Sequence, residues 1–137
     1  GYPAGAAVSY GSNPIRSGTG VIDLAGSTSS PEVIASTDSQ QLIITDLLFG
    51  FIQQHNHCRG AGEAKVIGSD GVTYARIPVY STTLGNATSQ PSQISARSGF
   101  AIPESTSVHV EWGWSWRECD AKDYSLAYNL TGYLSTP

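Results

Sequence analysis

The sequence predicts an all-β domain, a two-sheet β-sandwich of jelly-roll type with about eight strands and no substantial helix. Short runs of β-branched and aromatic residues are separated by clusters of Gly, Pro, Ser and Asn, which is the pattern of strands joined by turns. Two long runs near the C-terminus alternate between apolar and polar side chains, as half-buried strands do. No segment repeats apolar residues at the period of an amphipathic helix.

Residues 1–19 are expected to form an extended N-terminal arm. They are rich in Gly, contain two prolines and lack any hydrophobic period. Residues 20–137 are expected to form one domain, because this length suffices for a single buried core. The domain begins with two short β-branched runs, residues 21–24 and 33–35, and we expect a strand in each.

The middle of the chain holds its most apolar stretch and its clearest turn. Residues 42–52 are long enough for a helix, but their β-branched and aromatic content favours a buried strand with a bulge at Gly50. Further on, two alternating runs flank the four residues 68–71, which end in Asp-Gly, and this arrangement predicts a β-hairpin. Pro78 indicates that the second strand of this hairpin lies at a sheet edge or ends there. Residues 81–99 are polar and are expected to form a long surface excursion.

Three tryptophans at alternate positions are the sharpest feature of the C-terminal half. In the run 108–116, Trp112, Trp114 and Trp116 are expected to share one strand face. Three interpretations are open: all three rings are core, the stripe leaves the core midway and reaches a rim or a subunit contact, or the rings form an exposed platform that stacks on sugars. The final run, 126–134, also alternates and predicts the last strand.

The two cysteines, Cys58 and Cys119, are expected to form a disulfide, with two unrelated buried thiols as the alternative. Such a bridge would close a loop of about 60 residues and stabilise the fold by roughly 4 kcal/mol. Asn86 and Asn129 lie in acceptor sequons, so both are candidate glycosylation sites. Together these features predict a secreted glycoprotein, located outside the cell or at its surface.

Charge is scarce in this chain. Charged residues make up 13% of the sequence, about half of the usual quarter, and Ser and Thr occupy 30 positions. A surface of uncharged polar groups is common in secreted proteins and in subunits that pack into assemblies. The net charge is −4 and the few basic residues are scattered, so no nucleic-acid partner is expected. No apolar run approaches the roughly 20 residues that span a bilayer, so no membrane insertion is expected.

No catalytic residue, cofactor or metal is predicted. Glu111 and Glu118 lie on or beside the tryptophan strand and are the candidate pair for a glycosidase, but no motif supports an enzyme. Asp120 and Asp123 are weak candidates for binding Ca²⁺ through oxygen atoms, although the segment lacks the EF-hand pattern. The residues 55–58, His-Asn-His-Cys, suggest a transition-metal site, but a disulfide at the cysteine would remove one ligand from an already short set.

The last strand, Tyr128-Asn129-Leu130-Thr131-Gly132-Tyr133-Leu134, resembles the closing strand of the trimeric jelly-roll heads of the C1q and tumour-necrosis-factor type. Those heads close with an aromatic–small–Gly–aromatic–Leu pattern. The resemblance implies a jelly-roll architecture.

The expected function is non-enzymatic: an extracellular structural or adhesive subunit that assembles with itself into an oligomer, fibre or surface layer. The N-terminal arm and the apolar strand at residues 42–52 are the parts expected at subunit contacts. The alternative is a carbohydrate-binding module or lectin, with a glycan as ligand and the three tryptophans as its platform.

Overall fold

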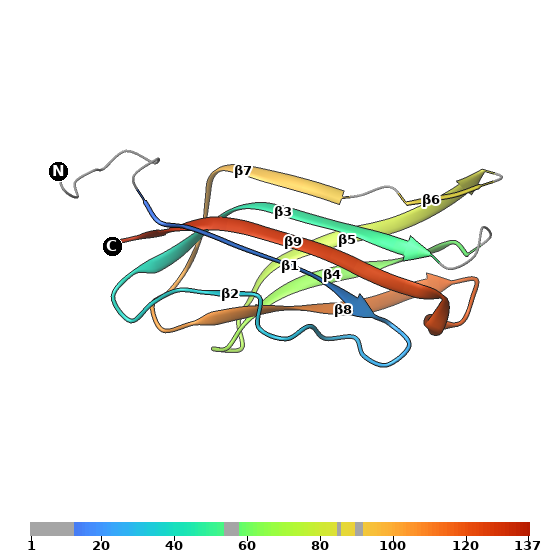
Figure 1. Cartoon of the computed structure of the whole chain (residues 1–137), viewed down its shortest axis with the longest axis horizontal. Coiled ribbons are helices and arrows are strands. Elements are labelled where there is room, and N and C mark those ends of the chain that lie inside the picture. Colours follow the sequence, from blue (N-terminus) through green and yellow to red (C-terminus); the bar gives the residue numbers. More distant parts are fainter. Residues whose placement is uncertain (1–12, 54–57, 85, 90–91) are drawn as a thin grey trace.

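The structure is a computed structural model that describes residues 13–53, 58–84, 86–89 and 92–137. In these ranges the chain forms antiparallel strands and one short 3-10 helix (Figure 1). The elements in chain order are β1 (Ile15–Asp23), β2 (Ile34–Ala35), β3 (Gln41–Gln53), β4 (Gly60–Gly68), β5 (Thr73–Leu84), β6 (Asn86–Ser89), β7 (Ser92–Ile102), β8 (Ser107–Arg117), η2 (Ala121–Asp123) and β9 (Tyr124–Ser135).

These strands form two antiparallel sheets that pack as a β-sandwich. The first sheet has the order β1-β9-β3-β7, and the second has the order β2-β8-β4-β5-β6. The first strand pairs with the last, and the inner pairs nest within it: β2 with β8, β3 with β7, and β4 with β5. This nested pairing is the jelly-roll arrangement, with β6 as a short addition at one edge. The predicted fold class is confirmed.

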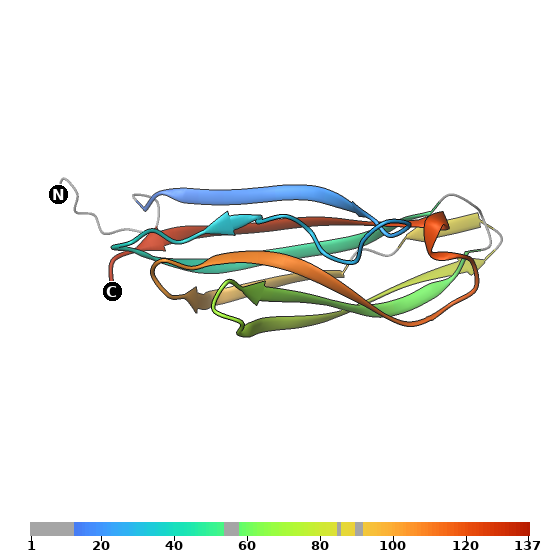
Figure 2. The ribbon, with the colours of Figure 1, turned by 90° about the horizontal axis from the view of Figure 1, so that it is seen from below.

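The two layers run along the long axis of the molecule (Figures 1 and 2). Along β9 the side chains alternate between buried and half-buried, and along β4 they do the same. The buried sets face each other across the sandwich, as two packed sheets require. The largest fully buried side chains include Tyr124, Phe49, Leu42, Ile44 and Leu130. One alternating pattern therefore builds the core from both sheets.

The predicted hairpin between β4 and β5 is confirmed. Gly71 adopts a φ of 84°, which an L-residue rarely does, and its N–H donates to the carbonyl of Gly68 at 2.9 Å. Asp70 accepts a hydrogen bond from the phenol of Tyr74 and a second one from the backbone N–H of Val72. The turn is thus held both by its glycine and by an aspartate that caps the loop.

Pro78 is confirmed at a sheet edge. It pairs with Glu63 of β4, while β6 pairs with β5 over residues 81–84 and not beside Pro78. A proline, which has no N–H to donate, is tolerated at such a position. The strand does not end at Pro78, because β5 continues to Leu84.

The structure differs from the sequence-based boundaries in three places. Residues 15–19, expected in the N-terminal arm, belong to β1, because β9 supplies hydrogen-bond partners that override the weak strand preference of a Gly-rich segment. The bulge in β3 lies between Ile44 and Asp46, not at Gly50. The expected surface excursion at 81–99 contains the end of β5, the strand β6 and much of β7. Residues 1–12 lie outside the described part of the chain.

No helix within the described ranges is long and apolar enough to cross a membrane.

Candidate functional site

The predicted disulfide is confirmed between Cys58 and Cys119, whose Cα atoms are 5.3 Å apart. It joins the chain just before β4 to the chain just after β8, and it is compatible with an extracellular location. The buried Tyr124 reinforces this end of the sandwich. Its hydroxyl donates to the carbonyl of Arg59 at 2.7 Å and accepts from the N–H of Cys119 at 3.2 Å.

The first two tryptophans of the stripe belong to the core. Trp112 is 4% exposed, and its ring lies edge-on to Phe51 with centroids 5.1 Å apart. Trp114 is half-buried, stacks on Phe51 at 5.6 Å and meets Tyr124 at 4.8 Å. Such aromatic pairs add to the energy of burial. The indole N–H of Trp112 has no hydrogen-bond partner among the described residues.

The third tryptophan lies on the opposite face of the strand. Trp114 pairs with Gly62 of β4, but Trp116 pairs with Ala61, so that Ser115 is one extra residue in β8. This bulge breaks the alternation and turns Trp116 outward, where 51% of it is exposed. The expectation that the three rings share one face is therefore wrong, and with it the three-ring platform. The stripe leaves the core midway.

Trp116 has an aromatic neighbour that the sequence did not single out. Ala61 pairs with Trp116 on one side and with Tyr80 of β5 on the other. Residues paired across antiparallel strands project to the same side of the sheet, so Tyr80 and Trp116 flank the methyl group of Ala61 on its outer side. Tyr80 is 52% exposed. We call these three residues the aromatic row. The alternation of Tyr80 with the buried Val79 was the available signal for its outward position.

Ion pairs lie on both sides of the aromatic row. On one side, the guanidinium of Arg59 binds Glu118 through two nitrogens, at 2.9 and 2.6 Å. Two residues along β4 from Ala61, Glu63 accepts a hydrogen bond from Arg76 at 2.9 Å. The hydrogen bond and the charge of Glu118 raise the pKa of Arg59 above its usual value. These pairs are partly exposed, so they contribute little to stability and keep capacity for further hydrogen bonds.

The two carboxylates of the candidate glycosidase pair are separated along the strand. Glu111 lies beside Lys65 in the register and accepts a hydrogen bond from His109 at 2.8 Å, whereas Glu118 lies beyond the end of β8. Seven positions separate them, and one of these is the bulged residue Ser115, which adds little length. The other six, at about 3.3 Å each, place the two glutamates about 20 Å apart. Glycosidases hold their carboxylates within roughly 10 Å of each other. The two glutamates do not form such a pair.

The candidate metal ligands are only partly brought together. The carboxylate of Asp123 and the sulfurs of Cys58 and Cys119 lie within 4.8 Å of one another. Those sulfurs are joined in the disulfide and are not thiolates, so they are poor metal ligands. Asp120 is not part of this group; its carbonyl accepts the N–H of Asp123 at 2.9 Å. Residues 55–57, with the two histidines of the suggested metal site, lie outside the described part of the chain.

A second surface feature lies on the other side of the sandwich. We call the outer surface of β1, β9 and β3 the apolar face. Several outward positions on these strands carry exposed or half-buried hydrophobic side chains or Gly: Ile15, Val21, Leu48, Gly50, Ile52, Ala127 and Tyr133. Ile43 also takes an outward position in the register but is buried. The remaining outward positions carry Ser, Thr, Asn or Gln, together with Asp23 and Asp46, and none is basic. An exposed surface of this composition is typical of a contact surface.

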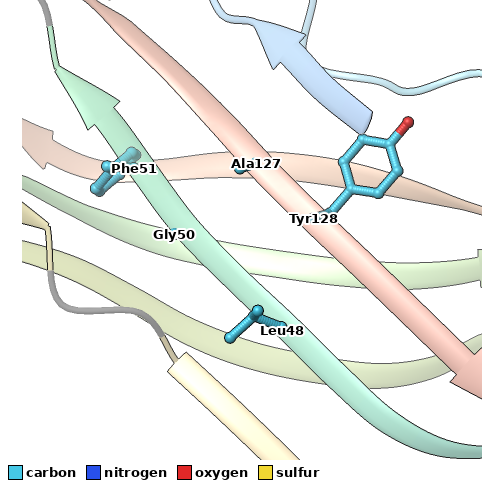
Figure 3. Close-up of a pocket in the computed structure, with 5 residues that line it drawn as sticks. All are labelled: Leu48, Gly50, Phe51, Ala127 and Tyr128. Atoms are coloured by element: carbon cyan, nitrogen blue, oxygen red, sulfur yellow. The ribbon is translucent and has the colours of Figure 1, made fainter. Parts of the chain in front are cut away.

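The apolar face contains a shallow hollow of about 170 Å³ (Figure 3). Leu48, Gly50, Phe51, Ala127 and Tyr128 line it. Gly50 of β3 pairs with Ala127 of β9, and these two small residues leave the recess between the larger side chains. Val21 of β1 pairs with Ala127 from the other side, and Ile52 lies two residues beyond Gly50. Val21, Leu48 and Ile52, around this recess, are between 37% and 56% exposed. The face thus presents both a recess and the apolar side chains that fit one.

The two sequons differ in what the structure describes. Asn129 is half-buried on the apolar face, between Thr19 of β1 and Leu48 of β3. Asn86 begins β6, and its side chain lies outside the described atoms.

No family model, no curated protein and no solved structure matches this chain significantly. The fold therefore defines a class, a disulfide-bonded jelly-roll β-sandwich. Within this class, function has to be argued from the two outer surfaces.

Proposed function

We propose that this protein is a non-enzymatic, secreted structural or adhesive subunit that assembles with itself through the apolar face. One observation carries the proposal: Val21, Leu48 and Ile52 are exposed around a hollow lined by Gly50 and Ala127. Leaving such side chains in water forfeits about 25 cal/mol for each Å² of apolar area that a partner would bury. Covering the face is therefore favourable.

A second copy of the chain fits this face better than an unrelated partner does. The recess and the projecting side chains lie on the same surface, so a two-fold axis through it places Leu48 or Ile52 of one copy against the hollow of the other. The absence of basic residues from the outward positions removes charge repulsion between Lys or Arg side chains. Asp23 lies at the end of β1 and pairs with Ser125, in the row next to that of Val21 and Ala127.

Two further features support an extracellular subunit. The disulfide favours an oxidising compartment, and the Ser- and Thr-rich surface is typical of secreted subunits.

Analytical ultracentrifugation of the oxidised chain tests the proposal. We expect a concentration-dependent oligomer for the natural sequence and a monomer for the double variant Val21→Glu/Leu48→Glu. Val72→Glu is the matched control, because Val72 is 47% exposed and lies on the hairpin of the other sheet. A natural chain that stays monomeric at high concentration would overturn the proposal, as would a control variant that dissociates the oligomer equally well.

A further inference from the structure

We propose that the aromatic row is a second binding site, one that takes a neutral glycan chain, with Tyr80 and Trp116 stacking on two of its sugar rings. This inference does not depend on self-assembly, because the row lies on the outer side of the second sheet and the apolar face lies on the outer side of the first.

The spacing of the two rings follows from the sheet. Tyr80 and Trp116 belong to β5 and β8, which flank β4, and both pair with Ala61. Two inter-strand spacings place their backbones about 10 Å apart. This separation is comparable to one disaccharide unit of an extended polysaccharide. Ala61, between the two rings, has only a methyl group. A sugar located between the two stacked sugars therefore has room above Ala61.

The exposure of Trp116 is produced by the β-bulge in β8. Without the extra residue Ser115, the alternation of β8 would turn Trp116 toward the same side as Trp112 and Trp114. Bulges re-aim side chains next to functional sites, and departures from local sequence rules gather where function requires them. The bulge therefore does more than end the strand: it presents an indole ring beside Tyr80.

The polar surroundings fit hydroxyl groups. The pair Arg59–Glu118 lies on one side of the row and the pair Arg76–Glu63 on the other. Guanidinium groups donate and carboxylates accept, so sugar hydroxyls find both kinds of partner on each side of the row. Two acids and two bases cancel in charge, which disfavours a phosphate or a polyanion and favours a neutral ligand.

The surface beside the row has open space for such a ligand. The neighbouring position on β8 is Gly113, and a Cβ added there would meet nothing within 4 Å. Its pair on β4 is Glu63. A sugar stacked on Trp116 thus has open space above Gly113 and a carboxylate within the next row.

A proline-rich peptide is the competing ligand, because polyproline helices also dock on exposed aromatic rings. Proline residues have no N–H, so such a peptide could accept from the two arginines beside the row but would donate little to Glu63 and Glu118. Sugar hydroxyls both donate and accept, so they can use both kinds of group. The glycan is therefore the ligand that the row fits better.

Isothermal titration calorimetry with the oxidised full chain tests the site. The probes are the hexasaccharides of cellulose, N-acetylated chitin, xylan and mannan, with a proline-rich decapeptide as the competing ligand. We expect at least one hexasaccharide to bind, and Tyr80→Ala and Trp116→Ala each to weaken binding about tenfold. Val72→Ala, which truncates another exposed apolar residue in the turn between β4 and β5, is expected to bind as the natural chain does.

The outcomes separate this site from the assembly surface. Both row variants are expected to keep the sedimentation behaviour of the natural chain and to shift its unfolding midpoint only slightly. The inference fails if none of the hexasaccharides binds at millimolar concentration, if the row variants bind as tightly as the natural chain, or if the peptide alone binds. Loss of self-assembly in Val21→Glu/Leu48→Glu leaves sugar binding unchanged, so the two proposals can fail separately.

Discussion

The first sheet turns Val21, Leu48 and Ile52 toward solvent, whereas the second sheet turns Lys65, Arg76 and Glu111 outward. The inner faces do not differ in this way, since both contribute buried apolar side chains to one core. Folding requires only the inner set to be apolar, because that set is removed from water. The difference between the outer faces is therefore not demanded by the fold, and the proposed self-assembly rests on it.

The second sheet shows what a solvated outer face looks like in the same chain. Its charged residues form the pairs Arg76–Glu63 and His109–Glu111. Exposed pairs of this kind contribute little to stability but keep a sheet soluble and discourage aggregation. On the apolar face, the charged residues at the outward positions are Asp23 and Asp46. The aromatic row lies on this charged face, between the pairs Arg59–Glu118 and Arg76–Glu63.

Trp112 and Trp116 give the strongest contrast between inner and outer positions on a single strand. Trp112→Ala is expected to lower the free energy of unfolding by about 3–5 kcal/mol, because a cavity replaces a buried ring. Trp116→Ala is expected to lower it by less than about 1 kcal/mol, because half of its surface is already in water. Urea denaturation of both variants measures the difference. Equal losses would contradict the outward turn of Trp116.

Removal of the disulfide is expected to have the next largest effect on the free energy of unfolding. Replacing Cys58 and Cys119 by Ser opens a loop with a sequence separation of 61 residues. The free energy of unfolding is expected to fall by roughly 4 kcal/mol in the loop-entropy model. Self-assembly is expected to persist wherever the variant stays folded, because the bridge joins strands of the second sheet and not those of the apolar face. Urea denaturation and sedimentation of the double variant check the two statements.

A glycan attached to Asn129 is expected to block self-assembly through the apolar face. The side chain lies between Thr19 and Leu48, so an attached glycan would separate two copies by its bulk. We expect the chain glycosylated at Asn129 to sediment as a monomer, and Thr131→Ala, which removes the sequon, to restore the oligomer. Intact mass spectrometry establishes occupancy, and sedimentation reads the state. An oligomer that retains the glycan at Asn129 would show that the subunits meet elsewhere.

The smallest expected effect on stability comes from the hydrogen bond between Tyr74 and Asp70 in the turn of the β4–β5 hairpin. Burial and the hydrogen bond to Asp70 raise the pKa of Tyr74 to about 12, and the same hydrogen bond lowers the pKa of Asp70. The depressed carboxyl pKa stabilises the fold above about pH 4, and the benefit is lost as the pH falls through the lowered value. The raised phenol pKa stabilises it below about pH 10, and that benefit is lost as the pH rises toward 12.

Tyr74→Phe removes both contributions. The difference in melting temperature between the natural chain and this variant is expected to be largest between these limits and to shrink on either side. Thermal unfolding followed across the pH range measures it. A difference that is constant with pH would show that the phenol–carboxylate contact does not form.

Much of the fold was predictable because its causes are local. The hairpin was predictable because Asp70 and Gly71 suit one kind of turn, and the last strand because its side chains alternate. The pairing of Cys58 with Cys119 needed no geometry, since the chain has no other cysteine. These features together determine an all-β sandwich closed by a disulfide.

The candidate sites depend on contacts between distant residues, and the sequence alone did not determine them. Residues 15–19 look like a flexible arm until β9 supplies the hydrogen bonds that make them an edge strand. Trp116 looks like a third core ring until the pairing of β8 with β4 leaves Ser115 as an extra residue. Tyr80 meets Trp116 across Ala61, and Val21 meets Gly50 across Ala127, only because strands far apart in sequence become neighbours. Alternation is read along one strand, whereas the rows that make a surface run across several, so the register of the sheets decided where the surfaces lie.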